Sequence, residues 1–240
     1  MNSGYTYEGS ELDVFAAATR WKRYFGRVLR PYLKGDILEA GAGIGGTTVV
    51  LHDGSASSWT CLEPDAALAG QLATRIASHG LASNTRVVVG NLSSLAPDLR
   101  FHCILYIDVL EHIEDDRSEL ERAGVRLHPD GTLVVLSPAH QWLFTPFDTA
   151  IGHCRRYNLA NLHRITPANL RLDRAFYLDS VGLLASLANK LLLRQSQPTL
   201  KQVRFWDGVL VPASGVMDPL LARRIGKSVV GIWRPAAGPI

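Results

Sequence analysis

The segment from Asp36 to Thr48, DILEAGAGIGGTT, constrains the fold more than any other stretch of this 240-residue sequence. Its apolar run from Ile37 to Ala40 is typical of a strand that is buried on both faces. The glycines that follow allow the backbone to approach a ligand closely, and the two threonines begin a helix. Because the N-terminus of a helix presents unpaired N–H groups and a positive dipole end, the segment predicts a nucleotide-cofactor site that suits a phosphate or a carboxylate.

Two cofactor fingerprints fit these glycines. The pattern G-x-G-x-x-G from Gly41 to Gly46 is that of a dinucleotide site, and Glu63 follows about 20 residues later, where an acid would bind ribose hydroxyls. The pattern E-x-G-x-G-x-G from Glu39 to Gly45 instead resembles the first motif of class I S-adenosylmethionine-dependent methyltransferases. Glu39 favours the methyltransferase, because its carboxylate would repel a pyrophosphate but attract the ammonium group of the methionine moiety. An NAD(P)-dependent oxidoreductase, a non-catalytic cofactor-binding partner subunit and a glycine turn without a ligand remain as alternatives.

Two later stretches also resemble the methyltransferase family. The run CLEPD from Cys61 to Asp65 is similar to the second motif, in which an acid at a strand end accepts hydrogen bonds from both ribose hydroxyls. Glu63 is that acid here. The run Gly90-Asn-Leu92 follows the next predicted strand, where the family usually has an acid that accepts from the adenine amino group. The carbonyl of Asn91 is able to accept the same bond, although a plain turn asparagine is the alternative.

The run YIDVLEHI from Tyr106 to Ile113 is similar to the segment after the fourth strand in small-molecule methyltransferases that O-methylate quinone precursors. Ligands of an open parallel sheet lie at the carboxyl ends of its strands, so Asp108 is expected to line the site or to cap the turn. His112 is a candidate general base for a phenol or an amine, or a histidine satisfied at the start of a helix. The Asn/Asp-Pro-Pro-aromatic tetrapeptide of DNA amino-methylases is absent from this position, which argues against a flipped-base substrate.

A segment rich in histidine, arginine and aromatic residues follows the fifth predicted strand and is expected to face the methyl acceptor. His140 and His153 are candidate bases, and the arginines and aromatic rings suit an aromatic or anionic acceptor. The segment resembles that of small bacterial methyltransferases with a His-x-Arg-Arg-Tyr run. The alternative is that Arg155 and Arg156 tie the loop to surface acids. Near the N-terminus, Tyr7 and Trp21 are expected to cover the cofactor or to pack the first helix.

The resemblance thus implies a full set of site residues. The expected cofactor-binding residues are Glu39, Gly41, Gly43, Gly45, Glu63, Pro64, Asn91, Leu92 and Asp108. The catalytic candidates are His112, His140 and His153. The expected substrate-binding residues are Tyr7, Trp21, His140, Trp142, Arg155, Arg156 and Tyr157. No metal ligand set with suitable spacing is evident, so the predicted reaction is independent of metal.

Alternation of strand and helix patterns predicts a Rossmann-like, doubly wound α/β sheet, mostly parallel with an antiparallel last strand and with helices on both faces. We expect a single domain over residues 1–240, with a helical lid at 1–34 and an acceptor-side loop insertion at 138–168. The expected strands are 37–40, 58–63, 86–89, 101–107, 132–136, 170–179 and 227–233, and the expected helices are 12–33, 65–79, 114–127 and 181–193.

Composition narrows the class of partner. The chain has 47% hydrophobic and 20% charged residues and a formal charge of +3, with its basic residues scattered, so nucleic-acid binding gains little support. The N-terminus lacks the pattern of a signal peptide, and the apolar stretch at 181–193 is too short to span a bilayer. We therefore expect a cytoplasmic monomer or homodimer that acts on a small-molecule acceptor and does not insert stably into a membrane.

Overall fold

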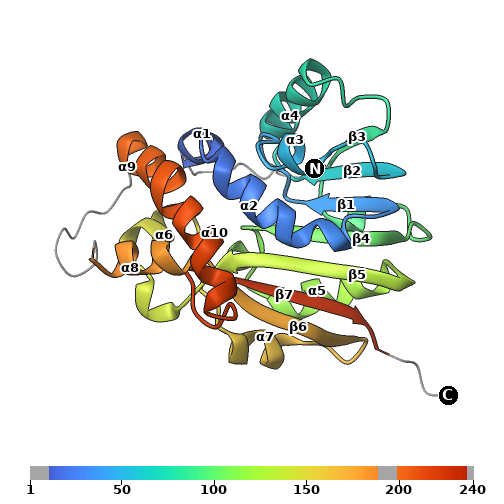
Figure 1. Cartoon of the computed structure of the whole chain (residues 1–240). Coiled ribbons are helices and arrows are strands. Elements are labelled where there is room, and N and C mark those ends of the chain that lie inside the picture. The colour runs from blue at the N-terminus through green and yellow to red at the C-terminus, as the bar shows by residue number, and fades with distance from the viewer. Residues whose placement is uncertain (1–10, 189–198, 237–240) are drawn as a thin grey trace.

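The computed structural model of the chain describes residues 11–188 and 199–236, and all structural statements concern these residues. Their centre is a seven-stranded sheet in the order β3-β2-β1-β4-β5-β7-β6 (Figure 1). The strands are β1 (Asp36–Ala40), β2 (Ser58–Glu63), β3 (Thr85–Val89), β4 (Phe101–Ile107), β5 (Leu127–Pro138), β6 (Leu170–Leu178) and β7 (Ser228–Pro235).

Strands β1 to β5 pair in parallel, whereas β7 lies antiparallel between β5 and β6. The expected Rossmann-like class, with its antiparallel last strand, is confirmed. Because the first five strands run in one direction, their carboxyl ends meet at one edge of the sheet. The segments that follow these strands therefore converge there.

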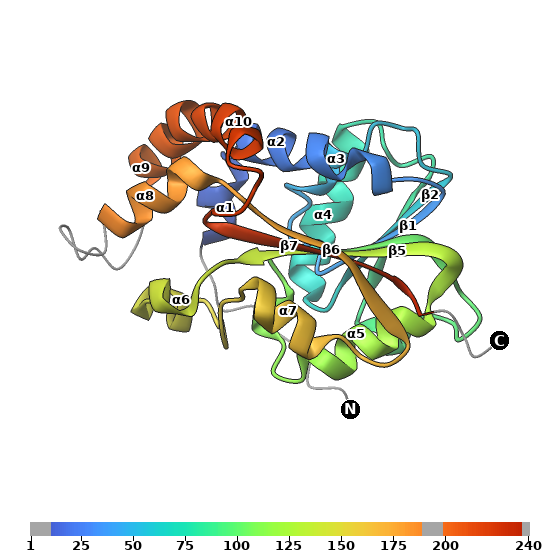
Figure 2. The same ribbon diagram turned by 60° about the horizontal axis from the view of Figure 1, so that its bottom comes forward.

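Helices cover both faces of the sheet, as Figure 2 shows. One core packs the sheet against α2 (Thr19–Leu29), α3 (Thr48–Leu51), α4 (Ala66–Ser78) and α10 (Val211–Leu220), and the other against α5 (Asp116–Val125) and α7 (Leu159–Ile165). Alternate residues of β1 serve the two cores, Ile37 on the α2 side and Leu38 on the α5 side, which is the period of a strand buried on both faces.

The remaining helices are short. They are α1 (Glu11–Ala16), α6 (Pro146–Ala150), α8 (Ser180–Ala188) and α9 (Leu200–Phe205), joined by single turns η1 (Arg30–Tyr32), η2 (Leu92–Ser94), η3 (Leu110–His112), η4 (Gln141–Leu143) and the π-helical turn η6 (Trp206–Leu210). Among the described helices, none is long and apolar enough to cross a bilayer.

Three expectations for local structure need correction. The helix expected at 12–33 is broken near Ala18 into α1 and α2. The turn sequence HPDG at 128–131 lies inside β5, where the register against β4 shifts between Phe101 and Cys103, so the extra residues form a bulge rather than a separate turn. The helix expected at 181–193 is described only to Ala188, and its remainder lies outside the described residues.

Candidate functional site

The glycine turn after β1 requires glycine for two reasons. Gly41, Gly43 and Gly45 all have positive φ, between 54° and 78°. A Cβ on Gly45 would also lie 2.6 Å from Cδ1 of Leu72, a contact that forces a shift. The turn is fixed to the end of β2, because the N–H of Gly41 donates to the carbonyl of Leu62 at 2.7 Å. The first two strands thus hold the turn at the carboxyl edge of the sheet.

Glu63, the last residue of β2, is bound to this turn. Its Oε2 accepts from the N–H of Gly43 at 2.8 Å, and its Oε1 accepts from the N–H of Asp65 at 2.9 Å. Burial raises the pKa of this carboxyl, while the two backbone hydrogen bonds act in the opposite direction. Asp65 in turn caps the start of α4 by accepting from Ala67 and Leu68, and Pro64 lies half-buried between the two acids.

Glu39 lies beneath the turn, on the α2 side of the sheet. Its side chain is almost fully enclosed, at 2% exposed, and Oε2 accepts from Nε1 of Trp59 at 2.9 Å. Burial raises its pKa to about 7, although the indole hydrogen bond opposes that shift. The buried acid therefore changes its charge near neutral pH.

The N-terminal helices lie over the glycine turn. Leu12 of α1 lies within 3.9 Å of the position that a Cβ on Gly43 would take, and Cε of Lys22 lies 3.7 Å from the equivalent position on Gly46. Trp21 points the other way and packs edge-on against Phe25, with their ring centroids 5.3 Å apart. Of the described residues of α1 and α2, Leu12 and Lys22 therefore lie over the glycine turn.

Lys22 is a site residue that the sequence reasoning did not single out. Burial lowers its pKa to about 8, while the charges of Asp108 and Asp207 raise it. Its Nζ donates to the carbonyl of Phe15 at 2.5 Å. A buried lysine that adjoins the glycine turn brings a basic group to this edge of the sheet. Tyr7, the other expected lid residue, lies outside the described residues.

Asn91 and Leu92 follow β3 as expected, but Asn91 already has local hydrogen bonds. Its Oδ1 accepts from the N–H of Ser93 at 2.9 Å and from the hydroxyl of Ser93 at 2.6 Å, which together cap the turn η2. A carbonyl oxygen has two lone pairs, and both are in use. Leu92 is buried in the α5-side core. Contact of either residue with an adenine ring stays a prediction.

Asp108 stands at the end of β4 in a left-handed conformation, with φ of 54°. The residue as a whole is exposed, whereas its carboxyl group is closely surrounded by other atoms, and its backbone N–H donates to the carbonyl of Leu136 at 2.8 Å. Desolvation raises its pKa to about 6, while His153, Lys22 and Lys227 lower it through their charges. Basic side chains from three distant parts of the chain therefore converge on one strained aspartate, which is a pattern typical of functional sites.

A buried charge cluster adjoins Asp108. Nδ1 of His153 lies 3.0 Å from Oδ1 of Asp148, and its Nε2 lies 3.8 Å from Oε1 of Glu111. Arg156 binds both oxygens of Asp148, at 2.8 and 2.9 Å. Ser137 donates to Oε2 of Glu111, whereas Oε1 has no hydrogen-bond partner within the described residues. The imidazole of His153 is therefore held between two buried acidic side chains, and burial raises the pKa of one of them, Glu111, well above its usual range.

The other two candidate bases differ from His153. Burial lowers the pKa of His112 to about 4, and its ring packs edge-on against that of His153 with the centroids 4.6 Å apart. Nε2 of His140 lies 3.0 Å from the carbonyl oxygen of Gly226, and its ring stacks on Tyr177. The structure thus places His112 and His153 together and puts His140 against the start of β7. The exposed Trp142 adjoins the His140 ring.

Two of the expected substrate-binding residues clamp the loop to α5. Nη1 of Arg155 lies 2.5 Å from Oδ2 of Asp116, and the hydroxyl of Tyr157 donates to the same oxygen at 2.8 Å. Tyr157 is buried. Together with the Arg156 pair, these bonds fit the alternative in which the arginines tie the loop to acids. Direct contact of the three residues with an acceptor stays a prediction.

Two groups of side chains in the described part of the chain bring potential metal ligands within 4.8 Å of one another. One is Glu111 with His112 and His153, and the other is Asp36 with His102 and His128 at the opposite edge of the sheet. Metal independence of the reaction remains a prediction.

Comparison with known proteins agrees with this geometry. Residues 38–133 match a family model described as a methyltransferase domain, and this span contains the glycine turn, Glu63 and Asp108. Residues 38–133 thus resemble a methyltransferase domain, and the chain has the fold of S-adenosylmethionine-dependent methyltransferases. A comparison with curated protein sequences found no match.

Solved structures that resemble this chain share its fold at low sequence identity. A S-adenosylmethionine-dependent methyltransferase from Clostridium acetobutylicum is 10% identical with a TM-score of 0.61, and the match covers 95% of this chain and 96% of that one. Coclaurine N-methyltransferase is 11% identical with a TM-score of 0.61, over 96% of this chain and 75% of that one. The mitomycin 7-O-methyltransferase MmcR is 15% identical with a TM-score of 0.58, over 92% of this chain but only 54% of that longer one.

Proposed function

We propose that this protein is a methyltransferase that transfers the methyl group of S-adenosylmethionine to an oxygen or nitrogen atom of a small aromatic or heteroaromatic molecule. The observation that carries the donor assignment is the bond between the Gly43 N–H and Glu63, which joins the glycine turn to the acid expected at the ribose. In the reaction, a lone pair of the acceptor forms a bond to the methyl carbon while the carbon–sulfur bond breaks. S-adenosylhomocysteine leaves, and the acceptor proton passes to a base.

The donor would lie across the carboxyl ends of β1, β2 and β4. Glu63 would accept from the ribose hydroxyls, which supply charge-assisted hydrogen bonds. Glu39 would supply negative potential beneath the methionine ammonium, and Lys22 would face the methionine carboxylate. Holding donor and acceptor in line is itself able to contribute about 7 to 11 kcal/mol to catalysis.

Asp108 is the proposed proton acceptor, with His153 near it and His112 packed against His153. A pKa of about 6 keeps the Asp108 carboxylate ionised at neutral pH and basic enough to take a proton from a phenol or an ammonium as methyl transfer proceeds. His140 and Trp142 would line the acceptor side. We further propose that the enzyme acts in the cytoplasm as a monomer or homodimer and uses neither metal nor nucleic acid.

Isothermal titration with S-adenosylhomocysteine and with NADH tests the donor, and binding of NADH alone would show an oxidoreductase. Methyl-labelled S-adenosylmethionine incubated with a metabolite extract tests the reaction. Labelled product that depends on the enzyme supports it. Tight donor binding without labelled product from aromatic, heteroaromatic and aliphatic acceptor sets would instead support a non-catalytic partner.

A further inference from the structure

Four arginines form a stripe along the outer side of α2. Arg20, Arg23, Arg27 and Arg30 follow one another at intervals of three and four residues, so they share one side of the helix. All four side chains are exposed, whereas Trp21 and the other core residues of the helix face the sheet. A stripe of this kind is usually a solvated face. Whether it binds a ligand depends on the cavities, charges and apolar side chains around it.

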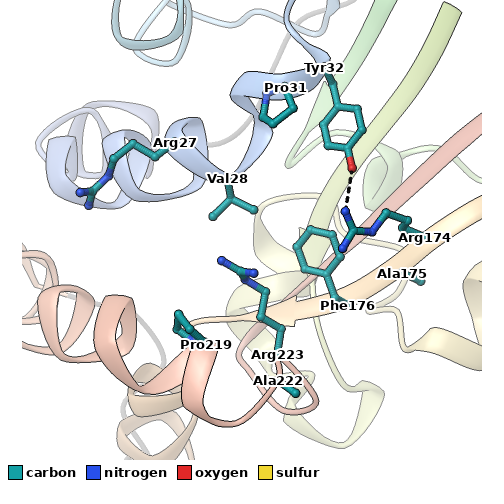
Figure 3. Close-up of a pocket in the computed structure, with 10 residues that line it drawn as sticks. All are labelled: Arg27, Val28, Pro31, Tyr32, Arg174, Ala175, Phe176, Pro219, Ala222 and Arg223. Atoms are coloured by element: carbon teal, nitrogen blue, oxygen red, sulfur yellow. Dashed lines mark hydrogen bonds between the residues drawn. The ribbon is translucent and has the colours of Figure 1, made fainter.

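Two cavities adjoin the stripe. One, of about 880 Å³, lies between α2, α3 and α10 and is lined by all four arginines together with Arg223. The other, of about 680 Å³, is shown in Figure 3, where Arg174 and Arg223 flank Phe176 and Arg27 lies farther away on α2. Both cavities share Arg27, Val28 and Arg223 in their lining, so they form one basic surface, here called the arginine groove.

The charges of the arginine groove are poorly compensated. No acidic side chain lines either cavity in the described part of the chain. Arg30 pairs with Asp53, and Arg20 donates to the carbonyl of Gly208. Arg23 and Arg27 have no hydrogen bond or ion pair to any described residue, and Nε of Arg223 is buried without a partner. The groove therefore keeps cationic groups available for an anion.

Exposed apolar side chains border the same groove on α10. Val216, which lines the larger cavity, is 65% exposed, and Leu220, one turn further along the helix, is 73% exposed. Met217 lies between them and is also exposed. Water-facing apolar residues next to a row of arginines suit a surface that offers both phosphate groups and hydrocarbon. A nucleic-acid backbone offers phosphates but no partner for Val216 and Leu220.

We propose that the arginine groove binds the headgroups of anionic phospholipids and docks the protein on a membrane surface, with Val216 and Leu220 entering the headgroup boundary. Arg23 and Arg27 contact phosphates at the rim, and Arg174 and Arg223 do so in the smaller cavity. This docking is peripheral. It uses the outer side of α2, while Lys22 on the same helix faces the glycine turn, so it does not depend on the methyl-transfer proposal.

Co-sedimentation of the full chain with vesicles tests the proposal. The wild type should bind vesicles of phosphatidylcholine with about 40% phosphatidylglycerol, bind pure phosphatidylcholine at least tenfold more weakly, and lose affinity as salt rises. The double variant R23E/R27E should bind the anionic vesicles at least tenfold more weakly than the wild type. The variant L220D should weaken the same binding and make the remainder more sensitive to salt.

Arg164→Glu is the matched control, because Arg164 is an exposed arginine on α7, on the opposite face of the sheet. Its binding should equal that of the wild type, and circular dichroism should show that all variants are folded. Equal binding to both vesicle types, or equal loss in R164E and R23E/R27E, would overturn the proposal. Release from vesicles by millimolar inorganic phosphate at constant ionic strength would show a free-phosphate site, and tighter binding to an RNA duplex than to vesicles would show a nucleic-acid site.

Discussion

The backbone N–H of Gly43 donates to Oε2 of Glu63 at 2.8 Å, which links a turn after β1 to the last residue of β2. The bond crosses between neighbouring parallel strands at their carboxyl ends. It sets the position of the Glu63 carboxylate before any ligand is present. A carboxylate oriented in this way loses little further freedom when it accepts hydroxyl groups.

Replacing Glu63 by Ala should weaken binding of S-adenosylhomocysteine by about 10-fold to 100-fold, because hydrogen bonds to charged groups contribute about 1.5 to 3 kcal/mol each. Isothermal titration measures the change. Asp98→Ala, at an exposed position near the amino end of β4, should bind like the wild type. Unchanged affinity in the Glu63 variant would show that the ribose site lies elsewhere.

Gly45→Ala and Gly54→Ala form a matched pair, because both glycines have φ near 80° but only Gly45 has a close neighbour. The left-handed backbone should cost each variant about 1 to 2 kcal/mol of unfolding free energy. The displaced Leu72 should add about 1 to 3 kcal/mol in Gly45→Ala, which should also lose donor affinity. Chemical denaturation and titration check both effects, and equal losses in the two variants would contradict the steric account.

Asp148→Asn should lower the free energy of unfolding by about 3 to 5 kcal/mol, because it leaves the charge of Arg156 buried without its partner. Burial alone would raise the pKa of Asp148, but hydrogen bonds from His153 and Arg156 hold it well below its usual range. The ionised acid therefore stabilises the fold above pH 4 and loses this effect as pH falls through the depressed pKa.

Asp173→Asn is the control for that experiment, because the ion pair of Asp173 with Arg171 is largely exposed. Its loss should cost less than about 1 kcal/mol. Urea denaturation at neutral and acidic pH measures both variants. A loss in Asp148→Asn no greater than that of the control would show that the loop does not depend on the buried acid.

Glu39 should make the unliganded protein less stable as pH rises. Its folded pKa of about 7 exceeds the unfolded value, so the proton stabilises the fold at low pH and this stabilisation disappears between about pH 4.5 and 7. Thermal midpoints of Glu39→Gln should lack this component. Trp59→Phe removes the indole hydrogen bond and should move the transition to higher pH. A Glu39→Gln curve parallel to that of the wild type would refute the shift.

Asp108→Asn tests the proposed base. In the wild type, kcat/KM for methyl transfer should fall as pH drops through about 6, because the carboxylate becomes protonated. The variant should lose this acid limb and about 10² to 10⁴ of the rate for an acceptor that must release a proton. Asparagine tolerates the left-handed backbone, so the turn should persist. An unchanged pH profile in the variant would show that a group other than Asp108 accepts the proton.

The donor half of the fold could be read from sequence because local signals and tertiary structure agree there. The apolar run before Gly41 and the capping acid Asp65 mark a strand and a helix by short-range chemistry alone. Strands β2 and β4 begin and end at the expected residues. The position of Glu63 followed, since parallel strands bring their ends to one edge.

The structure of the region beyond β5 was harder to predict from the sequence, because long-range contacts stabilise it. Helix α10 contains Pro212, Gly215 and Pro219, which disguise its helical pattern. Its Asp218 accepts from the backbone N–H groups of Asp179 and Ser180, bonds that no local pattern reveals.

Part of the candidate site could not be predicted from the sequence for the same reason. Lys22 lies beside the glycine turn because α2 packs over that turn. The residues around Lys22 in the sequence form no motif that indicates this position. Asp148 lies in the loop expected at 138–168, but its place between His153 and Arg156 depends on how that loop folds back.

The bonds to Asp116 and Asp148 fix the backbone of the acceptor-side loop without using its exposed side chains. Buried ion pairs and hydrogen bonds hold the backbone course, while Trp142 stands 49% exposed on the same segment. Exposed residues on so firmly held a loop can be exchanged without loss of fold. If Trp142 contacts the acceptor as proposed, a library of substitutions at this residue should contain enzymes with altered acceptor preference, and the two aspartates should be left unchanged in it.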